Sequence, residues 1–112
     1  MQVAIIGAGL AGLTAARQCQ AQGHHVTVYE KSRGVSGRMS TRQTELGGFD
    51  HGAQYFTASS DRFKKEVADW RKLEWVVPWE RKLVNLDHGK TTAAGKSSQR
   101  FVPVPGMSSL GK

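Results

Sequence analysis

The apolar pattern of the first thirty residues predicts three elements. Residues 2–6 (QVAII) form a short β-branched run that ends at Gly7, which is typical of a buried parallel strand. Residues 10–22 are rich in Ala, Leu and Gln and predict a helix, which Gly23 would end. Residues 25–29 (HVTVY) are again β-branched and predict a second strand. The chain therefore begins with a β-α-β unit, and we expect an α/β fold.

The middle of the chain predicts a loop, a hairpin and a second helix. Residues 31–37 are polar and contain two glycines, so they predict a loop. Residues 39–56 predict a β-hairpin, with ELGGF as its turn and DHGAQYF on the return strand. In residues 60–73 apolar side chains recur every three or four positions, which predicts a helix capped by Ser60 or Ser59.

The last third predicts further strands and ends on a turn. The stretches WVVPWERKLVNLDHG and QRFVPVP are typical of strands, and GKTTAAGKSS between them predicts a loop. Near the end, Ser108 is the expected cap of another helix. Because that helix signal stops after about one turn, we expect this chain to be the N-terminal part of a longer, two-domain protein.

Composition narrows the classes of partner. The formal net charge is +7, but basic residues are interleaved with acids, as in DRFKKEVADWRKLE, so we expect neither nucleic acid nor membrane as a partner. No segment has the roughly 18 apolar residues that span a bilayer. A single cysteine, Cys19, excludes an intrachain disulfide. We therefore expect a cytoplasmic protein.

The strongest motif is GAGLAG, a G-x-G-x-x-G formed by Gly7, Gly9 and Gly12. It follows a predicted strand and opens a predicted helix, which is the arrangement that binds a dinucleotide. Gly7 permits the tight turn, Gly9 lets a pyrophosphate approach the backbone, and Gly12 allows close helix–strand contact. The diphosphate then meets the positive end of the helix. At the end of the second strand, Glu30 can accept hydrogen bonds from the adenosine ribose and would repel a 2′-phosphate, so NADP is disfavoured.

A second glycine turn favours FAD over NAD. An NAD-binding unit would continue from the second strand into a helix, whereas KSRGVSGRMSTR follows Glu30 here. Gly34 and Gly37 allow close backbone approach, and Arg38 can neutralise either the diphosphate or a carboxylate that shapes the site.

These stretches resemble a known family. GAGLAGLTAARQCQAQGHHVTVYEKSRGVSGRMSTR followed by FDHGAQYFT is similar to the flavin-containing amine oxidase superfamily, and most similar to its renalase-like branch of FAD-dependent oxidoreductases. The resemblance implies a Rossmann-like FAD-binding domain over residues 1–112, incomplete because the substrate domain lies outside this chain. The family's Gly-Gly-Arg reads Ser36-Gly37-Arg38 here, so one glycine is replaced.

The resemblance and the motifs together define a candidate site. The family's flavin-ring segment corresponds to HGAQYF, and Lys31 would lie beside the ribose. No catalytic residue is assigned, and no spacing of metal ligands is present in the sequence. The candidate cofactor-binding residues are Gly7, Gly9, Leu10, Ala11, Gly12, Glu30, Lys31, Gly37, Arg38, Met39, Gly52, Ala53, Gln54 and Tyr55.

The implied function is that of an FAD-dependent oxidoreductase with non-covalent FAD. Its flavin would accept a hydride from a small molecule, either an amine or a reduced nicotinamide species related to NAD(P)H, and pass electrons to oxygen. This chain alone would be catalytically incomplete, and its oligomeric state is left open. The alternative is a stand-alone dinucleotide-binding module without catalysis.

Overall fold

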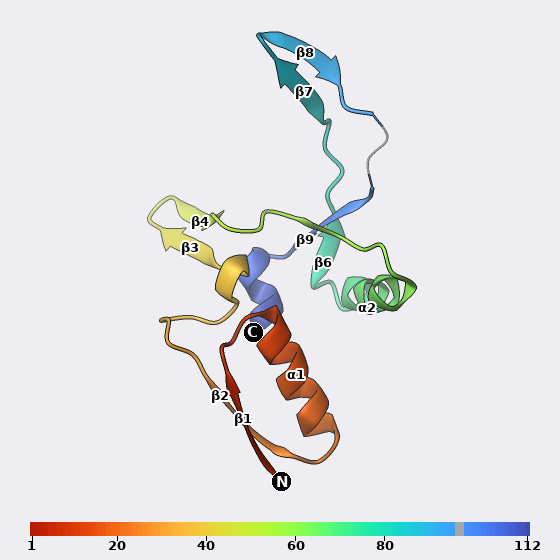
Figure 1. Ribbon diagram of the computed structural model, residues 1–112. Coiled ribbons are helices and arrows are strands. Elements are labelled where there is room, and N and C mark those ends of the chain that lie inside the picture. The colour runs from red at the N-terminus through yellow and green to blue at the C-terminus, as the bar shows by residue number, and fades with distance from the viewer. Residues whose placement is uncertain (96–97) are drawn as a thin grey trace.

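The N-terminal unit forms at the predicted bounds. The computed structural model describes residues 1–95 and 98–112 and places strand β1 at Gln2–Ile6, helix α1 at Leu10–Ala21 and strand β2 at His25–Tyr29 (Figure 1). The two strands pair in parallel, with Gln2 opposite His25 and Ile6 opposite Tyr29. Gly23 follows α1 with a φ of +82°, the left-handed conformation expected just after a helix. The βαβ unit is therefore confirmed.

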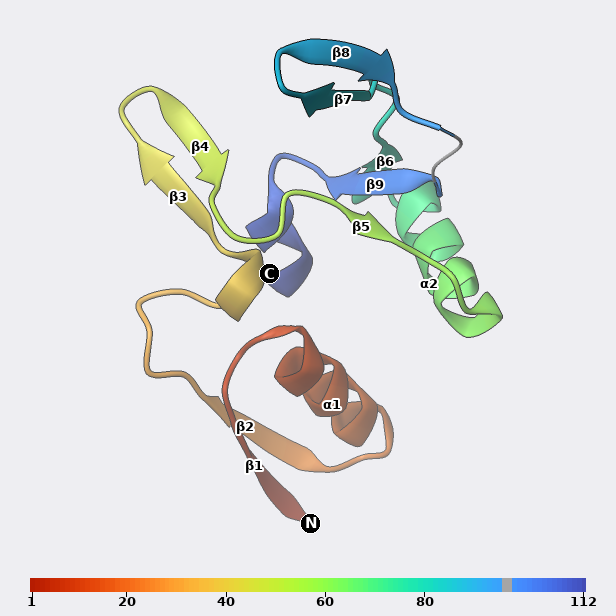
Figure 2. The same ribbon diagram turned by 45° about the horizontal axis from the view of Figure 1, so that its top comes forward.

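A second unit follows along the chain and is built on an antiparallel sheet. Helix α2 (Asp61–Lys72) begins at Ser60, whose hydroxyl accepts the Phe63 backbone N–H at 3.3 Å, as a helix cap should. Figure 2 shows α2 beside the sheet, whose strand order is β5-β9-β6. These strands are β5 (Phe56–Thr57), β6 (Val76–Pro78) and β9 (Arg100–Pro103).

The main hydrophobic core lies in this second unit. Val67 of α2, Val76 of β6 and Phe101 of β9 are buried together. The Phe56 ring stacks on that of Phe101 with 5.7 Å between centroids and meets the Phe63 ring at 5.8 Å. Among residues 1–30, by contrast, Ala8 is the only buried residue.

Two hairpins and two short 3-10 helices complete the described chain. The first hairpin joins β3 (Thr41–Thr44) to β4 (Gly47–Asp50), and the second joins β7 (Val84–Asp87) to β8 (Lys90–Ala93). The 3-10 helices are η1 (Gly37–Met39) and η2 (Met107–Gly111).

Three sequence predictions need correction. The return strand of the first hairpin is Gly47–Asp50, so only Asp50 of DHGAQYF belongs to it, and Phe56 instead pairs with Phe101 in another sheet. Part of the predicted loop GKTTAAGKSS is strand β8, since Asp87 pairs with Lys90 across a two-residue turn; residues 96–97 of that loop lie outside the described residues. Ser108 lies inside η2 and is not its cap, since the cap position is held by Gly106, which has no side chain.

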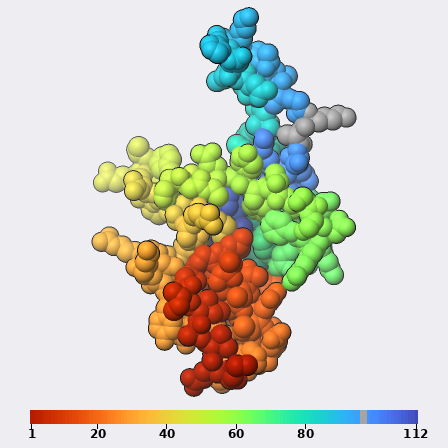
Figure 3. Space-filling model, viewed as in Figure 1, coloured from red at the N-terminus to blue at the C-terminus, as the bar shows by residue number. Residues whose placement is uncertain are grey.

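The described chain is extended rather than spherical. Its radius of gyration is 17.0 Å, whereas a compact domain of this length would have about 13 Å. Figure 3 shows the β7–β8 hairpin projecting from the rest of the surface at the end opposite the βαβ unit.

Within residues 1–95 and 98–112, no helix is long and apolar enough to cross a bilayer.

Candidate dinucleotide-binding site

The first glycine turn is shaped by the backbone alone. Gly7 has a φ of +96°, which a side chain would disfavour, and its N–H donates to the Tyr29 carbonyl at 2.7 Å. A Cβ at Gly12 would collide with the Gly7 carbonyl oxygen and meet Ile5 of β1. The structure therefore confirms that Gly7 makes the turn and that Gly12 brings α1 close to β1.

The N-terminus of α1 is open toward solvent. Gly9 occupies the cap position without a side-chain hydrogen bond, and the first turn holds no acidic residue. A Cβ at Gly9 would meet no atom within 4 Å, so the space in front of the first helical turn is free. Unpaired N–H groups at the positive end of a helix are suited to bind a phosphate.

Glu30 holds the first glycine turn in place. Its Oε2 accepts the Ala8 N–H at 2.7 Å, while its Oε1 accepts the Ser32 N–H at 2.8 Å and the Ser32 hydroxyl at 2.7 Å. The hydrogen bonds from the Ser32 hydroxyl and from the Ala8 and Ser32 amides lower the pKa of Glu30 from 4.5 to about 2. The carboxylate is therefore charged at neutral pH.

The second glycine turn meets the first. A Cβ at Gly37, whose φ is +53°, would lie 3.5 Å from the Gly9 Cα. The preceding residue, Ser36, is buried with a φ of +88°, and its N–H donates to the Ala8 carbonyl at 2.7 Å. A residue in this left-handed conformation is ordinarily glycine, which explains why the resembling family has glycine at this position.

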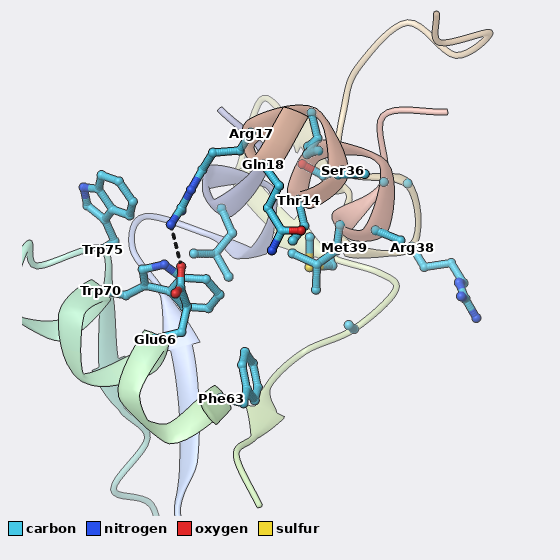
Figure 4. A pocket seen from close by; sticks show the side chains of 18 of the residues that line it. Thr14, Arg17, Gln18, Ser36, Arg38, Met39, Phe63, Glu66, Trp70 and Trp75 are labelled. Carbon is cyan, nitrogen blue, oxygen red and sulfur yellow. Dashed lines mark hydrogen bonds and ion pairs between the residues drawn. The ribbon is translucent and has the colours of Figure 1, made fainter. Parts of the chain in front are cut away.

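Arg38 and Gly52 are joined through the backbone. The Arg38 carbonyl accepts the Ala53 N–H at 3.0 Å, and a Cβ at Gly52 would collide with that carbonyl. Gly52 is thus required by the chain itself, apart from any space that it leaves for a ligand. The Arg38 side chain is exposed, and Figure 4 shows it extending away from the residues of α2.

A cavity of about 1420 Å³ opens where the two turns meet and runs between α1 and α2 (Figure 4). Across it, Arg17 of α1 and Glu66 of α2 form an ion pair at 3.0 Å. Eight predicted site residues line this cavity: Gly9, Leu10, Ala11, Gly37, Arg38, Met39, Gly52 and Ala53.

The cavity also includes residues that the sequence analysis missed. From α1 they include Leu13, Thr14, Arg17 and Gln18, and from the second unit Phe63, Glu66, Trp70 and Trp75. The α1 residues recur at helical spacing on one face of the helix, which is the signal that could have found them. The second-unit residues reach the cavity through tertiary packing, which no local pattern indicates.

The remaining predicted residues divide into three groups. Glu30 and Lys31 line a second cavity of about 550 Å³, and Gly37 forms part of the wall of both cavities. Gly7 and Gly12 shape the turn behind the cavities. Gln54 and Tyr55 line neither; the Tyr55 ring packs against Trp79 at 5.5 Å and under the Arg100 guanidinium at 4.7 Å.

Comparison with known proteins agrees with this geometry. Residues 5–70, more than half of the chain, match the family described as NAD(P)-binding Rossmann-like domain. The chain belongs to this family. Over 52 residues it is 46% identical to a 4,4'-diapophytoene desaturase of Staphylococcus aureus (strain Newman), a stretch that covers 46% of this chain and 10% of the desaturase.

Solved structures extend the likeness beyond the matched domain. A putrescine oxidase bound to putrescine superposes with a TM-score of 0.61 at 25% identity, covering 88% of this chain and 22% of the oxidase. A double mutant of putrescine oxidase gives a TM-score of 0.60 at 27% identity. These matches confirm the Rossmann-like α/β fold and the relationship to the amine oxidase superfamily. The chain spans only about a tenth to about a fifth of the length of these relatives.

Proposed function

We propose that this chain is the FAD-binding part of an FAD-dependent oxidoreductase of the amine oxidase and desaturase kind. The observation that carries the proposal is the meeting of two glycine turns, at Gly9 and Gly37, in front of the uncapped N-terminus of α1. The desaturase and the putrescine oxidase are both redox enzymes by name, and the work on the oxidase concerned its cofactor binding.

Each part of the site would hold a different part of the dinucleotide. The first-turn N–H groups of α1 would bind the diphosphate, and Arg38 would turn its guanidinium toward the same charge. Glu30 would accept hydrogen bonds from the ribose hydroxyls beside Lys31. When bound, FAD supplies hydride acceptance, while the protein orients it and excludes water. The cavity between α1 and α2, with its aromatic and aliphatic lining, suits the flat and largely apolar flavin ring.

The finer assignments rest on the sequence resemblance. They are a renalase-like enzyme in the cytoplasm, a hydride donor that is either an amine or a reduced nicotinamide species, and oxygen as the electron acceptor. Putrescine bound to the related oxidase supports a small-molecule donor. The charged Glu30 supports a cofactor without a 2′-phosphate.

A stand-alone dinucleotide-binding module without catalysis is the second candidate. Among the described residues that line the larger cavity there is no histidine, cysteine or tyrosine, and the one acid, Glu66, is paired with Arg17. A site that only binds a nucleotide would need no proton-transferring side chain.

The visible absorption spectrum of the purified full-length protein separates the two candidates. A flavin band that bleaches when an amine or a reduced nicotinamide is added would support the oxidoreductase. A colourless protein that binds NAD in calorimetry would contradict the FAD assignment and favour the stand-alone dinucleotide-binding module. The Arg38→Ala variant should lose flavin content, whereas Arg33→Ala, which removes an exposed arginine from the same loop, should keep it.

A further inference from the structure

The 3-10 helix η2 lies between the first hairpin and the second glycine turn. Both Figure 1 and Figure 2 show it, in dark blue, beside the start of β3. Met107, its first residue, is buried at 1% exposure, and Ser36 of the glycine turn is equally buried. Two segments about seventy residues apart in the sequence therefore meet at a partly buried contact.

The first hairpin, β3–β4, is hydrogen-bonded to η2 through Asp50 and Thr41. The Asp50 carboxylate accepts the Met107 N–H at 3.0 and 3.1 Å and the Thr41 hydroxyl at 2.5 Å. The Thr41 oxygen in turn accepts the Ser108 N–H at 3.1 Å. Asp50 and Thr41 thus satisfy two N–H groups at the start of η2 that the helix itself leaves unpaired.

The second glycine turn is hydrogen-bonded to η2 through Ser36. The Ser36 hydroxyl donates to the Ser108 carbonyl at 2.9 Å, and the Ser36 N–H donates to the Ala8 carbonyl at 2.7 Å. A Cβ at Gly111 would collide with the Ser36 hydroxyl, so η2 fits closely against this turn. A continuous series of hydrogen bonds therefore runs from Asp50 through η2 and Ser36 to the first glycine turn.

We propose that Thr41 and Asp50 are positioning residues that, through η2, hold Ser36 and Gly37 in the conformation that binds the cofactor. The proposal rests on the proposed function for its ligand, FAD. Gly37, immediately after Ser36, forms part of the wall of both cavities, so a shift of this turn would change both. Because Ser36 has a left-handed φ that serine adopts at a cost, the turn needs an external restraint to keep it.

The test compares three hydroxyl variants of the same hairpin. Thr41→Val keeps the shape and removes the oxygen that binds Ser108, whereas Thr41→Ser keeps that oxygen. Thr44→Val is the matched control, since the Thr44 hydroxyl donates to the Gly47 carbonyl at 3.0 Å at the far end of the hairpin. FAD affinity is measured by quenching of flavin fluorescence, and protection of the Ser36 amide by hydrogen exchange.

We expect Thr41→Val to weaken FAD binding at least about fivefold, because the partly buried Ser108 N–H loses its acceptor and η2 no longer restrains Ser36. Protection of the Ser36 amide should fall by a similar factor. Thr41→Ser and Thr44→Val should keep both within about twofold of the unaltered chain. Thr41→Val with unchanged Ser36 protection, or with unchanged FAD affinity, would overturn the proposal. Absence of FAD binding by the unaltered chain would instead overturn the proposed function, while the exchange experiment still decides whether Thr41 holds the turn.

Discussion

The βαβ unit and the α2–sheet unit obtain their structure in different ways. In the α2–sheet unit, Val67, Val76 and Phe101 form a buried apolar cluster surrounded by aromatic rings. In the βαβ unit α1 has no buried residue, and Ile6 and Tyr29 are exposed by 82% and 57%. Its order comes from short-range backbone geometry and from hydrogen bonds to Glu30 and Ser36.

This difference separates stability from ligand binding. The hydrophobic effect makes the α2–sheet unit the more stable part, because burial of apolar area is the dominant favourable term in folding. The βαβ unit and the glycine turn that follows it instead contain ten of the fourteen predicted cofactor-binding residues. Helix η2 is hydrogen-bonded to Ser36 of the second glycine turn and packs on β9. It therefore connects the region of the βαβ unit to the α2–sheet unit.

The largest expected effect follows removal of a core ring. Phe101→Ala should lower the free energy of unfolding by about 3–5 kcal/mol, since it leaves a cavity beside Phe56 and Val76. Urea denaturation followed by tryptophan fluorescence measures this. Leu86→Ala, at a position 76% exposed on β7, should change it by less than about 0.5 kcal/mol. Equal losses in the two variants would contradict the assignment of the core.

A smaller effect is expected in the βαβ unit. Gly12→Ala should cost about 1–3 kcal/mol, because the new methyl group pushes α1 away from the Gly7 carbonyl. Hydrogen exchange should show the loss in β1 and β2 while α2 keeps its protection. Gly34→Ala, where a Cβ meets no atom within 4 Å, is the control and should leave exchange nearly unchanged. Loss of protection in α2 as well would show that the two units unfold together.

Acid should affect the βαβ unit through Glu30. Because its folded pKa is lowered to about 2, the contribution of Glu30 is fully present above pH 4.5 and is lost as the pH falls toward 2. The Ala8 amide proton, which donates to Glu30, should report this titration in NMR spectra with a midpoint near 2. In Glu30→Gln the titration should disappear. A midpoint near 4.5 in the unaltered chain would show that the hydrogen bonds to Glu30 are not formed in solution.

Local signals explain how far the fold could be predicted. The βαβ bounds follow from β-branched runs and glycines, and α2 from its apolar period and its Ser60 cap. The apolar pattern does not predict strand β8 (KTTA), because all four of its residues are exposed and apolar and polar residues do not alternate in it. The sequence signal for this hairpin is the pair His88-Gly89. In the structure both residues have positive φ, as the central residues of a tight two-residue hairpin turn require.

The candidate site was predictable only in its short-range parts. The motif placed Gly7, Gly12 and Glu30, since their roles depend on neighbours within one βαβ unit. The bond of Ser36 to Ser108 and the collision of a Cβ at Gly52 with the Arg38 carbonyl depend on tertiary contacts. Sequence periodicity contains no information about such contacts.

The most direct test of the site is the FAD affinity of Gly9→Ala. Gly9 has an ordinary extended backbone conformation, and its Cβ would meet no protein atom, so alanine should leave the thermal unfolding midpoint unchanged. If the diphosphate lies against this turn, the methyl group occupies its place, and FAD binding should weaken at least about tenfold, which corresponds to about 1.4 kcal/mol. Unchanged FAD affinity in a folded Gly9→Ala chain would contradict the account.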